Sequence, residues 1–160
     1  PKLELAIAAA SQSLPGLEAR KAVLRELLDK PGKNNPLNAQ VVLFVPIFNV
    51  DGHERFAAWN RPNQRGPKQM GWRTTAQNLN LNRDYIKADT SEMRQWLALW
   101  TKWLPDFFID VHSTDGADYQ YDVTYGWNGR HAHSPAIATW LDEALRPELD
   151  RALAAAELRS

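Results

Sequence analysis

Residues 41–45 read VVLFV, and this stretch decides the expected fold. It is continuously apolar and rich in β-branched side chains, which is typical of a strand buried on both faces of a parallel sheet. Residues 3–9 (LELAIAA) and 107–112 (FFIDVH) are two further short apolar runs that predict strands. Residues 119–123 are a candidate for another short strand.

Three stretches have apolar residues at helical spacing. The first is residues 17–28, ended by the Pro-Gly pair at 31–32. The second is residues 93–104, preceded by Asp89 and Glu92 in the spacing of a capping box. The third runs from Ser134-Pro135 to about residue 157, with Ser as cap and Pro at the first helical position. Strands that alternate with helices predict an α/β domain with a largely parallel sheet.

A long irregular loop separates the second predicted strand from the second predicted helix. The strand ends in a predicted turn at residues 49–52, and residues 59–80 are rich in Arg, Asn, Gln, Gly and Pro without periodicity. Loops of this length are usually functional or disordered. The two tryptophans, Trp59 and Trp72, favour an ordered, functional loop.

Composition excludes several classes of partner. The 160 residues carry 19 acidic and 19 basic side chains, so no net charge favours nucleic acid or an anionic membrane. No apolar run approaches the roughly 18 residues of a membrane span, and the N-terminus lacks a signal-peptide pattern. We therefore expect a soluble chain; the compartment stays open, with an exported or periplasmic parent protein as one option.

The chain contains no cysteine, so any metal must be held by histidine and carboxylates. It begins at Pro1 rather than Met, and we expect it to be a piece of a longer protein. Its 160 residues suffice for one compact domain or part of a larger one.

The carboxyl ends of the predicted strands carry the polar candidates. In an open parallel sheet, ligands collect at this edge. Asp51 follows one strand and His112 ends another, and Asp110 lies two residues before His112 on the same face of the strand. Asp110 could thus orient a neighbouring metal ligand. The alternative is a capped strand end with a surface histidine.

Residues 80–84 read NLNRD and place Asn82 beside Arg83. The planar guanidinium next to an amide suits bidentate recognition of a carboxylate. The alternative is a solvated pair in a loop.

Taken together, residues 80–84, 110–113 and 45–52 resemble, in order and content, the signature segments of the zinc carboxypeptidase family, which includes the pancreatic carboxypeptidases. The resemblance spans roughly residues 41–125 and is closest to the bacterial branch. It implies a three-layer α/β fold with a mixed, largely parallel central sheet flanked by helices, here as a single, partial domain over residues 1–160. The implied function is zinc-dependent hydrolysis of a peptide or peptide-like amide next to a free carboxylate.

The resemblance also implies roles for individual residues. His112 would be the last of three zinc ligands, and Asn82 and Arg83 would bind the terminal carboxylate of the substrate. Arg65, or alternatively Arg61, would polarise the scissile carbonyl, and Ser113 would line the cleft. The zinc of the family activates a water that a glutamate deprotonates.

Two parts of the family pattern are missing. The first two zinc ligands form a His-x-x-Glu segment, whose place is held here by residues 13–16 (SLPG). Glu18 lies two residues late and is a poor substitute. The catalytic glutamate of the family lies well downstream of the third ligand, and we find no counterpart for it before Ser160.

Two alternatives to a hydrolase follow. One is a pseudoenzyme that binds C-terminal carboxylates without metal; the other is a structural or interaction module with a vestigial cleft. Among the remaining histidines, we expect His53-Glu54 to lie in a solvated turn, with an approach to a metal as the alternative. We expect residues 131–133 to form a polar lead-in to a helix, with chelation by His131 and His133 as the alternative. Trp96, Trp100 and Trp103 are expected to pack in the core.

Overall fold

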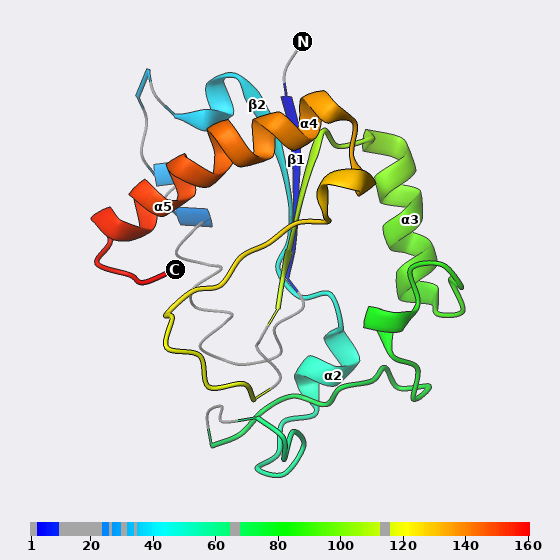
Figure 1. Cartoon of the computed structure of the whole chain (residues 1–160). Helices are drawn as coiled ribbons and strands as arrows, with labels where there is room; N and C mark the ends of the chain where they lie inside the picture. The colour runs from blue at the N-terminus through cyan, green and yellow to red at the C-terminus, as the bar shows by residue number, and fades with distance from the viewer. Residues whose placement is uncertain are drawn as a thin grey trace. The chain divides into compact units, whose positions relative to one another are not determined.

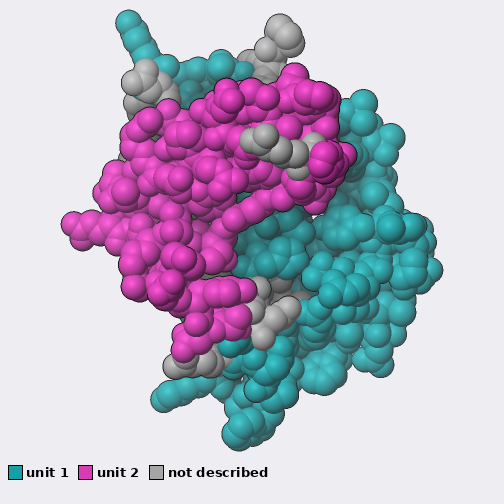
Figure 2. Space-filling model, viewed as in Figure 1, with its two compact units in different colours: residues 1–116 teal, residues 117–160 magenta. Residues whose placement is uncertain are grey.

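The computed structural model describes residues 3–9, 24–25, 27–29, 32–33, 35–64, 68–112 and 116–160, with residues 3–9 and Arg130 described by their backbone (Figure 1). The chain divides into two compact units, residues 1–116 and residues 117–160, shown in separate colours in Figure 2. We call them unit 1 and unit 2.

Unit 1 is built on a three-stranded parallel sheet. Its strands are β1 (Leu3–Ala9), β2 (Gln40–Val45) and β3 (Phe107–Val111), in the order β2-β1-β3. The register pairs Leu5 with Val42 on one side and with Phe107 on the other. The strands predicted at 3–9 and 41–45 are confirmed, and the one at 107–112 ends one residue early. Because all three strands run in the same direction, their carboxyl ends share one edge of the sheet.

The shorter elements of unit 1 connect these strands. They are η1 (Pro36–Asn38), α2 (Val50–Glu54), η2 (Leu81–Arg83) and α3 (Ser91–Trp103). Figure 1 shows α2 beyond the carboxyl ends of the strands, and η2 near the first turn of α3. Between α2 and η2, the described part of the chain is irregular, as predicted, apart from one antiparallel bridge between Ala57 and Met70.

Helix α3 begins one residue later than the predicted capping box implied. Its N-cap is Thr90, whose Oγ1 accepts a hydrogen bond from the backbone N–H of Met93 at 3.1 Å. Asp89 was therefore the wrong cap. The helix ends at Leu104, which takes a left-handed conformation with φ 44° immediately before Pro105. The left-handed residue and the proline together stop the helix.

The core of unit 1 lies between α3 and the sheet. Leu81, Met93 and Trp96 form its buried centre, and Val45 and Phe108 pack against it. The rings of Trp96 and Trp100 lie 5.7 Å and 5.2 Å from that of Phe108, which confirms the core role expected for these two tryptophans. The core thus ties η2, α3 and the sheet together.

Two of the predicted elements differ from the structure, and a third is described only in part. Residues 49–52 are not a simple turn, because Asn49 caps the helix α2 by accepting a hydrogen bond from Gly52 at 3.0 Å. Residues 119–123 form no strand; instead, the N–H groups of Asp122 and Val123 donate to the carbonyl of Arg159. Residues 24–25 and 27–29 are helical, and the rest of the predicted helix at 17–28 lies outside the described residues.

Unit 2 consists of an irregular segment and a segmented helix. Its elements are η3 (Arg130–Ala132), α4 (Pro135–Trp140), the π-helical η4 (Leu141–Leu145) and α5 (Arg146–Ala155). Ser134 caps α4 as predicted. Within the described ranges, no helix is both long and apolar enough to cross a membrane.

Candidate functional site

The Asn-Arg pair lies on η2, a single turn anchored from both ends. The side chain of Asn80 accepts a hydrogen bond from the N–H of Asn82 at 3.1 Å, and the N–H of Arg83 donates to the carbonyl of Asn80 at 2.9 Å. Leu81 is only 3% exposed and belongs to the core. The turn is therefore held by its cap and by the core, while Asn82 is half-buried and Arg83 is exposed.

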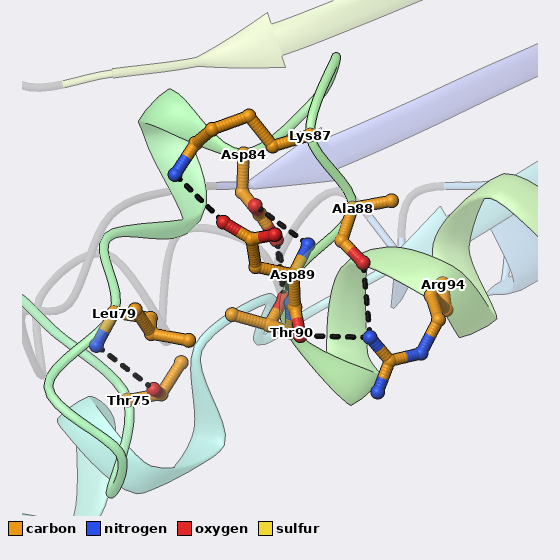
Figure 3. A network of polar contacts seen from close by, with 8 residues as sticks. All are labelled: Thr75, Leu79, Asp84, Lys87, Ala88, Asp89, Thr90 and Arg94. Atoms are coloured by element: carbon orange, nitrogen blue, oxygen red, sulfur yellow. Dashed lines mark hydrogen bonds and ion pairs between the residues drawn. The ribbon is translucent and has the colours of Figure 1, made fainter.

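Asp84, the next residue, joins η2 to the start of α3 (Figure 3). Its carboxylate is buried and accepts hydrogen bonds from the N–H groups of Asp89 and Thr90 and from the Thr90 hydroxyl, at 2.9, 2.9 and 2.7 Å. Burial by itself would raise the pKa of Asp84, but these hydrogen bonds and the charge of Lys87 outweigh it and lower the pKa. Asp84 is thus an ionised structural anchor beside the candidate site.

The guanidinium of Arg83 is available to a ligand. Its Nη1 donates to the carbonyl of Asn82 at 2.8 Å. Among the described residues, no carboxylate pairs with Arg83. An arginine presents five N–H donors in a planar fork, so most of its donors remain open to an anion.

His112 lies just beyond the carboxyl end of β3, and Asp110 holds its ring. The Nε2 atom of His112 is 2.8 Å from Oδ2 of Asp110, and the two side chains are 42% and 29% exposed. This contact leaves Nδ1 without a partner among the described residues. A histidine ring backed by a carboxylate on one nitrogen is a common setting for a metal ligand.

Tyr85 links the two predicted segments. Burial, and then the negative charge of Asp110, raise the pKa of Tyr85 to about 12. The ring of Tyr85 stacks on Phe48 at 6.3 Å, beside the core. Leu81 of η2, Tyr85 and Phe108 of β3 belong to one core cluster, so η2 lies beside β3.

Several of the predicted site residues are not described by the structure or have other contacts. Arg65 and Ser113 lie outside the described residues, as do residues 13–16 and Glu18. Arg61, the alternative to Arg65, is half-buried and makes contacts of its own. Asp51 accepts a hydrogen bond from the N–H of Ala76 at 2.9 Å, which gives it a structural role in holding the loop.

His53 was expected in a solvated turn, and this expectation is wrong. It is 7% exposed on α2, with Nδ1 2.8 Å from Oε1 of Glu54 and a buried Nε2 that has no hydrogen-bond partner. His53 lies four residues after Asn49, the buried cap of α2, so the two residues share one face of the helix. This spacing predicts burial of His53 only if residues 50–54 are already known to form a helix. Trp72 Nε1 and Thr74 Oγ1, in the loop packed on α2, are also buried without a partner.

A zinc site would need three protein ligands. In the part of the chain that the structure describes, no group of three histidine, cysteine, aspartate or glutamate side chains is arranged to hold a metal. His112 with Asp110 fits one ligand position, and the described residues do not complete the set. Comparison of the chain with known protein families, with curated proteins and with solved structures found no match.

Proposed function

We propose that the carboxyl edge of unit 1 binds a free carboxylate, such as the C-terminus of a peptide or peptide-like molecule. The observation that supports this most directly is the exposed guanidinium of Arg83 on a turn that is anchored in the core. Asn82 stands beside it as a second donor. An arginine fork gives a carboxylate two parallel hydrogen bonds, which a lysine cannot reproduce.

Anchoring of the turn supports binding energetically. The cap of Asn80, the burial of Leu81 and the hydrogen bonds of Asp84 fix the backbone on both sides of Arg83 before any ligand arrives. Little conformational entropy is therefore lost when a ligand binds to this backbone, so the affinity is reduced less by ordering.

The binding test compares a short N-acetylated peptide that has a free carboxylate with its C-terminal amide, by calorimetry on the 160-residue chain. We expect the acid to bind and the amide to bind at least tenfold more weakly, because a charge-assisted hydrogen bond contributes roughly 1.5–3 kcal/mol. Arg83→Ala should abolish this preference and Arg83→Lys should keep only part of it. Arg151→Ala, an exposed arginine on α5, is the matched control. Equal affinity for acid and amide would refute the proposal.

The catalytic version of this proposal is zinc-dependent, carboxypeptidase-like hydrolysis next to the bound carboxylate. The resemblance of residues 80–84 and 110–113 to the zinc carboxypeptidases supports it, with His112 as a zinc ligand, Arg65 or Arg61 near the scissile carbonyl and Ser113 in the cleft. The second candidate is a pseudoenzyme that binds the carboxylate and does not cleave, and the sequence favours it because residues 13–16 (SLPG) hold the place of the His-x-x-Glu ligands of the family.

A zinc titration separates these two candidates. Tight binding of one zinc ion that is lost in His112→Ala, and retained in the exposed control His131→Ala, would favour the hydrolase and justify peptidase assays. Absence of zinc binding, together with a preserved preference for the free carboxylate, would favour the pseudoenzyme.

A further inference from the structure

Unit 2 contains an asparagine that is followed directly by a glycine, at Asn128-Gly129. Every other asparagine of the chain is followed by a residue that has a side chain. The backbone nitrogen of a glycine is the least hindered nucleophile that can attack the side-chain amide of the residue before it. In a folded protein, this attack depends on whether the backbone is free to bring the two groups together.

The structure leaves this pair unrestrained. Both residues are exposed and lie in irregular backbone just before η3. Among the described residues, neither the side-chain amide of Asn128 nor the N–H of Gly129 has a hydrogen-bond partner. The carbonyl of Gly129 accepts a hydrogen bond from the N–H of Ala132 at 2.8 Å, but this bond does not involve the attacking nitrogen. The nitrogen and the amide are therefore free to approach each other.

The surroundings of Gly129 are also open. A Cβ added there would meet no heavy atom within 4 Å. The backbone of Gly129 has φ −57° and ψ 162°, an extended conformation that any residue adopts. The fold therefore does not need a glycine at this position, and an alanine fits without strain.

The Asp-Gly pair of α2 shows what protection looks like. Asp51-Gly52 has the same two groups in sequence, but the N–H of Gly52 donates to the side chain of Asn49 at 3.0 Å. The carboxylate of Asp51 accepts a hydrogen bond from Ala76 at 2.9 Å, and a Cβ on Gly52 would lie 2.3 Å from the carbonyl oxygen of Trp72. Helical geometry, hydrogen bonds and close packing thus restrain that pair, and none of the three is found at Asn128.

We propose that Asn128 is a site of spontaneous deamidation, a modification that is independent of the proposed carboxylate binding. The backbone nitrogen of Gly129 loses its proton to hydroxide and attacks Cγ of Asn128. A bond forms between this nitrogen and Cγ, the bond from Cγ to Nδ2 breaks, and ammonia leaves. Water then opens the resulting succinimide ring. Cleavage of the new bond gives aspartate, and cleavage at the original main-chain carbonyl gives isoaspartate.

Both products change the charge and one changes the backbone. The chain has 19 acidic and 19 basic residues, so a carboxylate at position 128, ionised at neutral pH, turns a neutral chain into a negative one. Isoaspartate also routes the main chain through its Cβ, which lengthens the backbone directly before Gly129, the N-cap of η3. We expect the structural effect to stay within the segment that leads into η3.

The test follows the amide in the full 160-residue chain by mass spectrometry after incubation at mildly acidic and mildly alkaline pH. Trypsin releases residues 103–130, in which Asn128 is the only asparagine, and fragmentation assigns the site. We expect the acid to form faster at alkaline pH, because the attacking nitrogen must lose its proton. The same incubation in guanidinium chloride gives the rate without the fold. The native rate should lie within about threefold of it, a barrier difference below about 1 kcal/mol.

Two substitutions test the reaction itself. Gly129→Ala places a Cβ beside the attacking nitrogen and should slow the loss of the amide by at least about tenfold, or about 1.4 kcal/mol in the barrier. Asn128→Gln should also keep its amide, because its longer side chain would have to close a six-membered ring. Gly126→Ala is the matched control, since a Cβ at this exposed glycine likewise meets nothing within 4 Å. It should react as fast as the wild type.

Two results would overturn the proposal. A native rate at least about tenfold below the rate in guanidinium chloride would mean that the fold protects Asn128. Equal rates in Gly129→Ala and the wild type would mean that the nitrogen of Gly129 is not the nucleophile.

Discussion

At the scale of single residues, Asp84 anchors the turn that carries the candidate site. Its carboxylate joins η2 to the first turn of α3 through three hydrogen bonds with Asp89 and Thr90. Asn82 and Arg83 could be predicted from the sequence because an Asn-Arg pair has a recognisable chemistry. The role of Asp84 could not, because a carboxylate after an arginine reads equally well as a solvated loop residue.

Asp84 should make stability depend on pH in the acidic range. Its pKa in the folded chain lies below the ordinary value of 3.8, so its contribution is fully present above that value and is lost as the pH falls through the folded pKa. We expect Asp84→Asn to melt at a lower temperature than the wild type at pH 7, and the difference to shrink steadily below about pH 4. Thermal melts followed by circular dichroism between pH 2 and pH 7 measure this. A difference that stays constant across the range would show that the charge of Asp84 is irrelevant.

Tyr85 should make stability fall as the pH rises in the alkaline range. Its pKa is raised to about 12, so its contribution to stability is present below pH 10 and is lost as the pH rises from 10 toward 12. An absorbance titration should show a phenol that ionises near pH 12 and is missing from Tyr85→Phe. If Tyr85→Phe still showed a phenol that ionises near pH 12, this ionisation would belong to another tyrosine.

At the scale of elements, strands were easier to predict than caps and short helices. Residues 41–45 could be assigned because they are continuously apolar, and residues 3–9 because they are apolar except for Glu4. The cap of α3 was misplaced by one residue, because Asp89 and Thr90 are both good cap types. The hydrogen bonds that the N–H and hydroxyl of Thr90 donate to Asp84 decide between them. Helix α2 was missed because five residues are too few to show a periodicity.

The cap of α3 can be tested with two neighbouring substitutions. Thr90→Ala should destabilise unit 1 by about 1 kcal/mol or more, because it removes the cap of Met93 and a donor to buried Asp84. Asp89→Ala should cost much less, since the side chain of Asp89 pairs only with exposed Lys87. Urea denaturation of the two variants gives the comparison. A larger loss of unfolding free energy in Asp89→Ala than in Thr90→Ala would identify Asp89 as the cap, as the sequence alone suggested.

At the scale of the whole molecule, β2 and β3 are the outer strands of the described sheet. Within the described residues, neither β2 nor β3 has a strand on its outer side, and Ile109 and Val111 of β3 are 38% and 39% exposed. Unpaired strands of this kind are templates for pairing with another chain. The strand order, and with it the position of these outer strands, became known only from the structure.

The open strand should make the isolated chain self-associate as its concentration rises. Ile109→Lys, which places a charge on the exposed part of β3, should reduce this association. Ile137→Lys is the control, because Ile137 is 50% exposed but lies on α4 of unit 2. Sedimentation velocity over a range of concentrations decides the matter. A wild-type chain that remains monomeric throughout would contradict the prediction.

The π-helical segment η4 in unit 2 has a consequence for how the chain tolerates length changes. A π turn closes its hydrogen bond one residue later than an α turn, so it accommodates an additional residue without ending the helix. One residue corresponds to about 100° of helical rotation, so η4 sets the angle between the faces of α4 and α5. It lets Ala138 turn inward while Arg146 lies over the ring of Trp127, at 4.8 Å from its centroid. Residues 141–145 therefore fix the rotation of α5 relative to α4, and a one-residue deletion there would rotate α5 so that Arg146 no longer lies over Trp127.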